Sequence, residues 1–305
     1  GNAPGNDMRF YYERVENSRN FANKVWNASR FIMMNMEQAL EKTGKDITTP
    51  AAADLQPVDK WILSKLNTLV KDVTDNMDHF ELGIAVQKVY DFIWDEFCDW
   101  YIELVKYRIY HSDENYKSAN AALWTLKTVL GNALKMLHPF MPFVTEEIYS
   151  ALVPEEKSLM MSDWPQFSED WCYADAENIT DHMKEVIRGV RNARAEMNVP
   201  PSRKAKVYVV CEDEKLCEGF EELTTCACPL MSASELAVQA DKAGIADDAV
   251  SIVVPDASVY VPLEELIDFE QEIERLTKEE EKLTKEINRA KGMLSNEKFV
   301  SKAPQ

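Results

Sequence analysis

Hydrophobic residues recur every three or four positions through most of the chain as far as residue 198. This spacing gathers apolar side chains on one face of an α-helix, so it predicts a mainly helical fold. The predicted helices cover roughly 10–42, 56–79, 81–111, 117–138, 143–152 and 174–198, with an extended linker at 158–167. Boundary residues agree with two of these limits, because Gly44 follows the first helix and Pro57 stands near the start of the second.

The hydrophobic period changes after residue 203. Alternation of apolar and polar residues is typical of half-buried strands, and it predicts a small α+β unit. The predicted strands are 204–212, 235–239, 250–254 and 258–263, with a helix-like segment at 215–223 between the first two. From Leu266 to Leu294 the three- and four-residue spacing returns amid dense Glu and Lys, and it predicts one strand of a coiled coil. We expect this strand to lack a partner, so that residues from about 270 onward are either mobile or paired with a second copy of the chain.

A helical wheel divides the aromatic residues of the first helix. Phe21 falls on the apolar stripe, so we expect it in the core. Phe31 falls on the opposite side, where its neighbours are amides and cations: Asn20, Asn23, Lys24, Asn27 and Arg30. An aromatic ring in such surroundings suits stacking on a nucleobase, with neighbours that bond base edges or hold phosphate. The alternative is that another helix covers the ring.

The same wheel drawn for the third helix singles out Ile102. The expected core stripe runs from Leu82 to Leu104, and Ile102 lies opposite it. An apolar side chain on that side fits a contact with RNA. Since Ile84 and Ile109 share this side, a second packing face is the alternative.

The formal net charge of −19, from 34 Lys and Arg against 53 Asp and Glu, should repel nucleic acid at long range. Binding to nucleic acid must therefore use local basic patches. The first patch, residues 9–30, includes Arg14, and the second, residues 188–206, includes Arg188, Arg191 and Arg194. For each patch a solvated helix face is the alternative.

Other candidate chemistry is sparse. The six cysteines form no CxxC pair, and Cys226-Ala-Cys228 has no histidine nearby, so we expect reduced thiols and no metal site. No GxSxG, HExxH or Gly-rich nucleotide loop occurs, and no ExxH pair supports a carboxylate-bridged metal site in a bundle. The sequence has no run of about 18 apolar residues, and its opening GNAPGNDMRF lacks the features of a signal peptide. We expect an internal piece of a longer cytoplasmic chain, without a membrane partner.

Five strings resemble one protein family. They are RNFANKVWNASRF (19–31), PVDKWILSKLN (57–67), FIWDEFCDWYIELVK (92–106), LHPFMPFVTEEIY (137–149) and VRNARAEMNVPPSRK (190–204). They are similar to the C-terminal half of valyl-tRNA synthetases, in the helical anticodon-binding domain shared by the class I synthetases for Ile, Leu, Val and Met. LSNEKFVSKAPQ at the end resembles the tip of that family's coiled-coil arm. RAEMNVPPSRK and the arm favour the valine enzymes over the isoleucine and leucine enzymes, which are the alternative.

The resemblance implies both an organisation and a function. The implied parts are 1–9, the tail of a catalytic core; 10–165, the anticodon-binding domain; 166–262, a connecting helix and α+β unit; and 263–305, the first strand of the arm. The family's enzymes, which we expect to be monomeric, attach valine to tRNA using ATP and Mg²⁺. Their HIGH and KMSKS motifs do not occur in this sequence, so we expect neither catalysis nor a cofactor in this piece.

The family's anticodon contacts carry over to a few positions. Phe31 matches an aromatic residue that stacks on the anticodon, with Asn27 and Arg30 beside it. Ile102 matches an apolar anticodon contact, and Arg14 falls where the family can place an arginine. A different class of protein also fits the sequence, namely a helical scaffold with a coiled-coil oligomerisation arm and no nucleic-acid role. The salt dependence of complex formation distinguishes these two classes, because a tRNA complex weakens steeply as the salt concentration rises, whereas an oligomer formed through an apolar seam need not.

Overall fold

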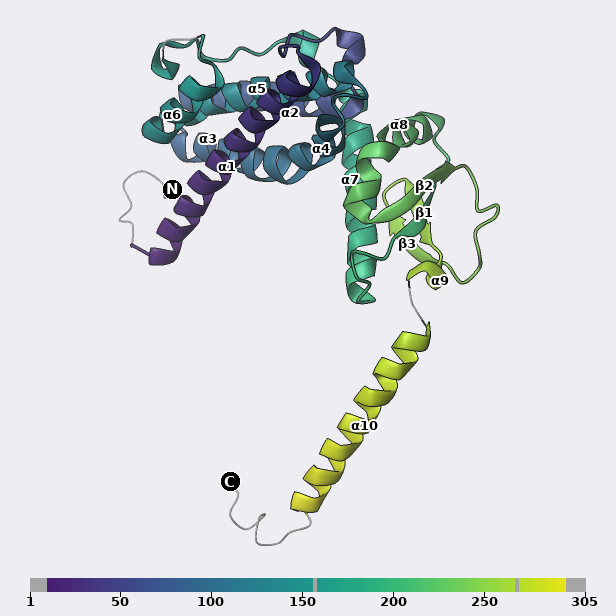
Figure 1. The fold of residues 1–305 in the computed structure, drawn as a ribbon. Helices are drawn as coiled ribbons and strands as arrows, with labels where there is room; N and C mark the ends of the chain where they lie inside the picture. The colour runs from purple at the N-terminus through teal and green to yellow at the C-terminus, as the bar shows by residue number, and fades with distance from the viewer. Residues whose placement is uncertain (1–9, 156–157, 267–268, 295–305) are drawn as a thin grey trace.

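The computed structural model describes residues 10–155, 158–266 and 269–294. Figure 1 shows a bundle of helices, then a small sheet with helices on one face, and then a long helix that leads away from both. The helices as far as the sheet are α1 (Tyr12–Thr43), α2 (Pro57–Asp78), α3 (Leu82–Asp91), the π-helix η2 (Phe92–Tyr101), α4 (Ile102–Tyr110), α5 (Tyr116–Leu137), α6 (Pro142–Leu152) and α7 (Ala174–Glu196). Three short 3-10 turns, η1 (Ala52–Asp54), η3 (Leu159–Met161) and η4 (Glu169–Trp171), lie in the loops. The expected mainly α class with a small α+β unit is confirmed.

Local signals in the sequence explain several helix ends. Pro57 begins α2, where its missing N–H costs nothing, and Gln56 and Asp59 form a capping box. The side chain of Asn115 caps α5 by accepting a hydrogen bond from the N–H of Ser118. Gly44 ends α1 in the left-handed region at φ +67°, and its N–H bonds the carbonyl of Leu40. These ends therefore follow from single residues rather than from packing.

A buried ion pair joins three helices inside the bundle. The guanidinium of Arg108 on α4 donates two hydrogen bonds of 2.8 Å to the carboxylate of Asp59 at the start of α2. The hydroxyl of Tyr101 donates to the same carboxylate at 2.7 Å, and Arg108 also donates to Ser118 on α5. Burial of such a pair is tolerated because its hydrogen-bonding groups are satisfied. The cluster fixes the relative positions of α2, α4 and α5.

The π-helix η2 changes which residues face the core. A π-helix closes its hydrogen bonds five residues apart instead of four, so residues beyond it are rotated away from the positions that an α-helical wheel assigns. Ile84, before η2, is 50% exposed, whereas Ile102 and Ile109, after it, are 7% and 3% exposed. Leu82, expected in the core, is 47% exposed. The predicted outward position of Ile102 is therefore wrong, and the cause is this ten-residue π segment.

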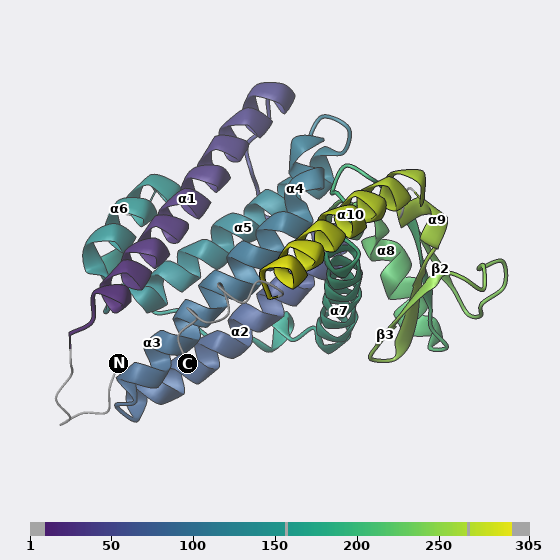
Figure 2. The same cartoon turned by 90° about the horizontal axis from the view of Figure 1, so that it is seen from below.

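The α+β unit stands beside the bundle, and in Figure 2 helix α7, seen nearly end-on, lies between the two. Its sheet has the order β2-β1-β4-β3, with β1 parallel to β2 and the other neighbours antiparallel. The elements are β1 (Ala205–Val210), α8 (Glu214–Met231), β2 (Ala233–Gln239), β3 (Val250–Val254) and β4 (Ala257–Val261). Gly189 on α7 allows close packing on β3, since an added Cβ would lie 2.8 Å from a methyl carbon of Ile252. All four predicted strands are present, and α8 is longer than expected.

A histidine on α7 contacts the turn between β3 and β4. The Nδ1 of His182 lies 2.7 Å from the carbonyl of Asn178, and its Nε2 lies 3.0 Å from the carboxylate of Asp256. Both acceptors require an N–H, so this geometry fits the doubly protonated ring. Burial alone would lower the pKa of His182, but these two hydrogen bonds and the charge of Asp256 outweigh it and raise the pKa.

The cysteines differ from the sequence-based expectation at one place. Cys211, at the end of β1, and Cys217, in the first turns of α8, form a disulfide across a Cα–Cα distance of 6.2 Å. The expectation that all six cysteines are reduced is therefore wrong for these two, because the turn between β1 and α8 brings them together. Cys98, Cys172, Cys226 and Cys228 are free, and burial raises the pKa of the Cys98 and Cys226 thiols to about 12.

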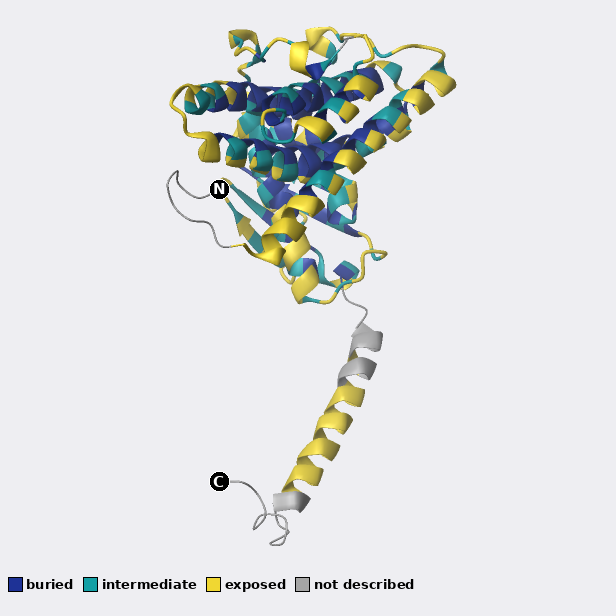
Figure 3. Cartoon of the chain, turned by 90° about the vertical axis from the view of Figure 1, so that its left-hand side faces the viewer, coloured by how far each residue is buried: buried dark blue, intermediate teal, exposed yellow. Residues whose placement is uncertain are grey.

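The chain ends in a short helix and a long one. Helix α9 (Leu263–Leu266) closes the α+β unit, and α10 (Phe269–Leu294) follows the expected coiled-coil seam. The seam residues Ile273, Leu283 and Ile287 are 63%, 51% and 53% exposed. Figure 3 shows that buried residues are concentrated inside the bundle and that the coloured part of α10 is exposed. These three residues of the seam are therefore solvent-exposed. Residues 295–305 and the predicted catalytic-core tail at 1–9 lie outside the described residues.

Candidate nucleic-acid interface

Helix α1 runs alongside α3, η2 and α4 in the same direction. The ring of Phe21 lies 4.5 Å from that of Tyr90, centroid to centroid. Further along, Lys24 Nζ lies 2.6 Å from the carboxylate of Asp99, and near its end α1 donates from Lys42 Nζ to the carbonyl of Tyr110 at 3.2 Å. The two helical segments therefore share one rim along most of α1.

The residues that α1 presents to this rim include the predicted stacking residue. Lys24 Nζ stands 3.7 Å from the ring centroid of Trp94, and Lys106 Nζ stands 5.9 Å from that of Phe31. Lys24, Asn27 and Phe31 are spaced by three and four residues, so they lie on one face of α1. Asn27 and Arg30 are exposed. The structure thus brings together Phe31, Asn27 and Arg30 as the sequence predicts, and it adds Lys106.

Phe31 is less exposed than the helical wheel predicts. Its side chain is half-buried and packs against the edge of the core, whereas Phe21 is 4% exposed. One part of the Phe31 ring therefore supports the fold and the other is open to solvent. Ile102 is almost fully enclosed, so only 7% of its surface could touch another molecule.

Arg14 is far from this group. It lies 17 positions before Phe31 in one continuous helix, which corresponds to about 25 Å along the axis at 1.5 Å per residue. It is exposed, and its guanidinium carbon lies 5.3 Å from the ring centroid of Tyr11. Arg14 and Phe31 therefore cannot contact the same nucleotide in this arrangement.

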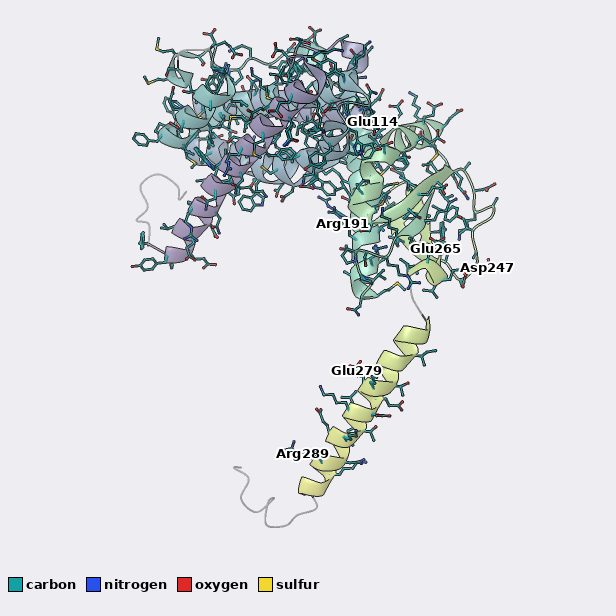
Figure 4. The ribbon with its side chains drawn as sticks, viewed as in Figure 1. Glu114, Arg191, Asp247, Glu265, Glu279 and Arg289 are labelled. Carbon is teal, nitrogen blue, oxygen red and sulfur yellow. A yellow bond between two sulfur atoms is a disulfide. The ribbon has the colours of Figure 1, made fainter. Side chains whose placement is uncertain are left out.

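A second group of cations lies on α7, against a tryptophan of η2. The guanidinium carbons of Arg188 and Arg191 lie 5.1 Å and 5.9 Å from the ring centroid of Trp100, within cation–π range. Both arginines are exposed. Arg188 also pairs with Glu185, and Arg191 Nε donates to the carbonyl of Leu230 on α8. This pair forms a small cationic surface between the bundle and the sheet; Arg191 is labelled in Figure 4.

Arg194 does not belong to that surface. It is 6% exposed, and its Nη2 donates to the carbonyls of Pro200 and Arg203 at 3.1 Å and 2.6 Å. Burial lowers the pKa of its guanidinium. The expectation that Arg194 contacts an RNA backbone needs correction, because the side chain is buried and its Nη2 is hydrogen-bonded inside the protein. Neither charge nor helical spacing distinguishes it from Arg188 and Arg191 in the sequence.

Acidic residues border the rim. Burial and the charges of Asp91 and Asp99 raise the pKa of Asp95 on η2. The rim therefore combines aromatic faces, amides and a few cations with a border of carboxylates.

Among the described residues, no group of three or more His, Cys, Asp or Glu side chains could hold a metal ion. Within that same part of the chain, no helix has the length and apolar character needed to cross a membrane.

Comparison of the sequence with known proteins gives two family matches. Residues 59–209 match the family described as the anticodon-binding domain of tRNA ligase, and residues 268–305 match the valyl tRNA synthetase tRNA binding arm. The whole chain is 50% identical to a valine–tRNA ligase of Clostridium tetani and 49% identical to one of Clostridium perfringens, and spans 34% of each. It is 42% identical to that of Carboxydothermus hydrogenoformans, of which it spans 33%.

The chain thus covers about a third of the length of the curated relatives it matches, over all of its own length. The identity to these relatives extends over the whole chain, so every part of the chain has a counterpart in them. The chain belongs to the valyl-tRNA synthetase family, and it carries that family's anticodon-binding domain and tRNA-binding arm.

Proposed function

We propose that this chain binds valine tRNA and reads its anticodon at the rim between α1 and α4. One observation carries the proposal: Phe31 is a partly buried ring with one part open to solvent, Asn27 and Arg30 are exposed beside it, and Lys106 lies across the rim. A single-stranded base can stack on the open part of such a ring. The match of residues 59–209 to anticodon-binding domains supports the choice of tRNA.

The neighbours of Phe31 have distinct roles in this proposal. The amide of Asn27 offers both donors and an acceptor, which suits the edge of a base. Arg30 offers a cation for phosphate, and so does Lys106, whose Nζ donates to the carboxylate of Glu103 at 2.6 Å in this structure. Ile102 supports the rim from beneath and meets RNA only through its exposed edge. Arg14 serves a nucleotide outside the anticodon stack, since it lies about 25 Å away along α1.

The cations on α7 extend the interface. Arg188 and Arg191 are placed to hold the RNA backbone, with Trp100 behind them. Each phosphate contact adds to the salt dependence of binding, because counterions are released from the RNA. Localised contacts of this kind are needed to overcome a net charge of −19.

The proposal extends to the longer enzyme. In it, residues 10–165 form the anticodon-binding domain, 166–262 the connecting helix and α+β unit, and 263–305 the start of the arm. A cytoplasmic valine–tRNA ligase would carry out ATP- and Mg²⁺-dependent aminoacylation with parts that this chain does not span. The chain's own contribution is to select and orient the tRNA.

A second candidate function is a scaffold that oligomerises through its arm. The observation in its favour is the exposed apolar seam at Ile273, Leu283 and Ile287. A seam-driven oligomer forms without RNA and does not require low salt, whereas a tRNA complex weakens as salt rises.

The test is a titration of labelled valine tRNA at several salt concentrations, with isoleucine tRNA as the competitor. Phe31→Ala should weaken binding by about 1–3 kcal/mol, the usual cost of losing one base–aromatic stack. Phe143→Ala is the matched control, because it removes a ring that is 91% exposed on α6. Equal affinity of both variants, or binding that ignores salt, would favour the scaffold.

A further inference from the structure

Three cations of α7 lie against one indole of the bundle. Lys184, Arg188 and Arg191 are spaced four and three residues apart, so they share one face of the helix. Lys184 Nζ lies 5.5 Å from the ring centroid of Trp100. The guanidinium carbons of the two arginines lie 5.1 Å and 5.9 Å from the same centroid. All three distances are within cation–π range, so the indole attracts each of these charges.

The Trp100 ring is itself held firmly. It is 8% exposed, and Lys184, which contacts it, is 5% exposed. Lys184 Nζ also lies 2.6 Å from the carboxylate of Glu96 on η2 and 4.7 Å from the ring centroid of Trp61 on α2. These contacts join α7 to the bundle, so the indole is a fixed surface for the two exposed arginines.

The two arginines differ in the partners of their nitrogen atoms. Arg188 Nη1 donates to the carboxylate of Glu185 at 2.5 Å, which offsets its charge. Arg191 Nε donates to the carbonyl of Leu230 on α8 at 2.7 Å. Among the described residues, none accepts a hydrogen bond from Nη1 or Nη2 of Arg191. The Arg191 guanidinium is therefore held by the indole and by α8, while its two terminal nitrogens remain open to an anion.

From this geometry we propose that Trp100 is a positioning residue, which holds Arg191 as a preset fork for one phosphate of the bound RNA. A planar guanidinium presents two parallel N–H donors that match two phosphate oxygens. An unsupported arginine would lose side-chain freedom on binding, and that loss lowers affinity. Trp100 and α8 restrict Arg191 beforehand, so the complex avoids much of this loss. The phosphate contact rests on the proposed function, but the restriction of Arg191 does not.

The first test measures the order of the arginine side chain without RNA. Nuclear magnetic resonance relaxation of Nε–H groups in isotope-labelled arginine reports motion on the picosecond to nanosecond timescale. The signal that disappears in Arg191→Lys belongs to Arg191. We expect its order parameter to be above about 0.8 in the unchanged chain and to fall below about 0.6 in Trp100→Leu, the range of flexible groups. Trp100→Phe should keep the arginine ordered, because a phenyl ring also attracts a guanidinium.

Phe97→Leu is the matched control for lost packing. Phe97 lies on the same π-helix and is fully buried, and its ring pairs with that of Tyr101 at 6.3 Å. The variant should lower the melting temperature, as Trp100→Leu does, yet leave Arg191 ordered. Circular dichroism checks that each variant keeps its fold. The proposal is overturned by a mobile Arg191 in the unchanged chain, by an ordered one in folded Trp100→Leu, or by equal loss of order in both variants.

Titration with valine tRNA at several salt concentrations then tests the phosphate contact. Arg191→Gln should weaken binding about tenfold and reduce the slope of log affinity against log salt by about 1, because one phosphate contact is lost. Trp100→Leu should weaken binding about fivefold without changing this slope, since the charge remains but must be ordered on binding. Arg188→Gln should weaken binding less than Arg191→Gln, since Glu185 already offsets the charge of Arg188.

Two results of the titration would contradict the preset fork. One is a reduced slope in Trp100→Leu, and the other is a loss in Arg188→Gln as large as that in Arg191→Gln. Failure of the unchanged chain to bind tRNA would refute the proposed function and the phosphate contact with it. The relaxation measurement would still decide whether Trp100 holds Arg191.

Discussion

Ile102→Ala tests whether η2 turns Ile102 into the core. Its side chain is 7% exposed. Replacing isoleucine by alanine removes three carbons, and at about 0.8 kcal/mol per buried CH₂ the transfer loss is about 2.4 kcal/mol. The cavity left behind adds to this, so the free energy of unfolding should fall by about 2–4 kcal/mol.

Ile84→Ala is the matched control, since an uninterrupted α-helix would place Ile84 and Ile102 on one side. Ile84 is 50% exposed and leaves no enclosed cavity, so its loss should be about 1 kcal/mol. Urea unfolding followed by circular dichroism measures both variants against the unchanged chain. If Ile102→Ala costs no more than Ile84→Ala, the π-helical register is wrong and Ile102 is a surface residue.

Four further predictions follow from the described residues. Phe21→Ala should lower the free energy of unfolding by about 3–5 kcal/mol in thermal or urea melts, and Phe31→Ala by about half of that, because only Phe21 is fully buried. Arg108→Leu should cost about 3–5 kcal/mol in the same melts, since it leaves a buried carboxylate unpaired. Because the pKa of His182 is raised in the folded state, its stabilising contribution is present below the unfolded-state pKa and is lost as pH rises through the folded-state pKa. Melts of His182→Gln over this pH window should therefore show a smaller loss of stability with rising pH than melts of the unchanged chain. Leu283→Glu should abolish any self-association through α10 seen by analytical ultracentrifugation, because a charge interrupts the apolar seam.

The long helices could be predicted from the sequence because their faces are regular. The expected range 56–79 became Pro57–Asp78, and 117–138 became Tyr116–Leu137. The strands followed from alternation in the same way. Helix α8 was expected to end at 223 but continues to Met231, with Pro229 inside it. Its packing against α7, α4 and β2 supports turns that have no clear period in the sequence.

The candidate site was predicted less completely. The wheel placed Asn27, Arg30 and Phe31 together because all three lie on one unbroken α-helix. It failed at Ile102, because a π segment carries no signal in the spacing of apolar residues. Arg194 could not be separated from its neighbours either, since its burial depends on carbonyls in a loop whose shape is set by tertiary contacts.

The most direct test of the anticodon-reading proposal is crosslinking from position 31. A photoreactive benzoyl-phenylalanine replaces Phe31 in one variant and Phe143, on α6, in another. Valine tRNA is irradiated with each at low salt, and the joined nucleotides are mapped by primer extension. The proposal predicts crosslinks from position 31 within the anticodon loop and none there from position 143. Crosslinks from position 31 to other parts of the tRNA, or equal yields from both positions, would contradict it.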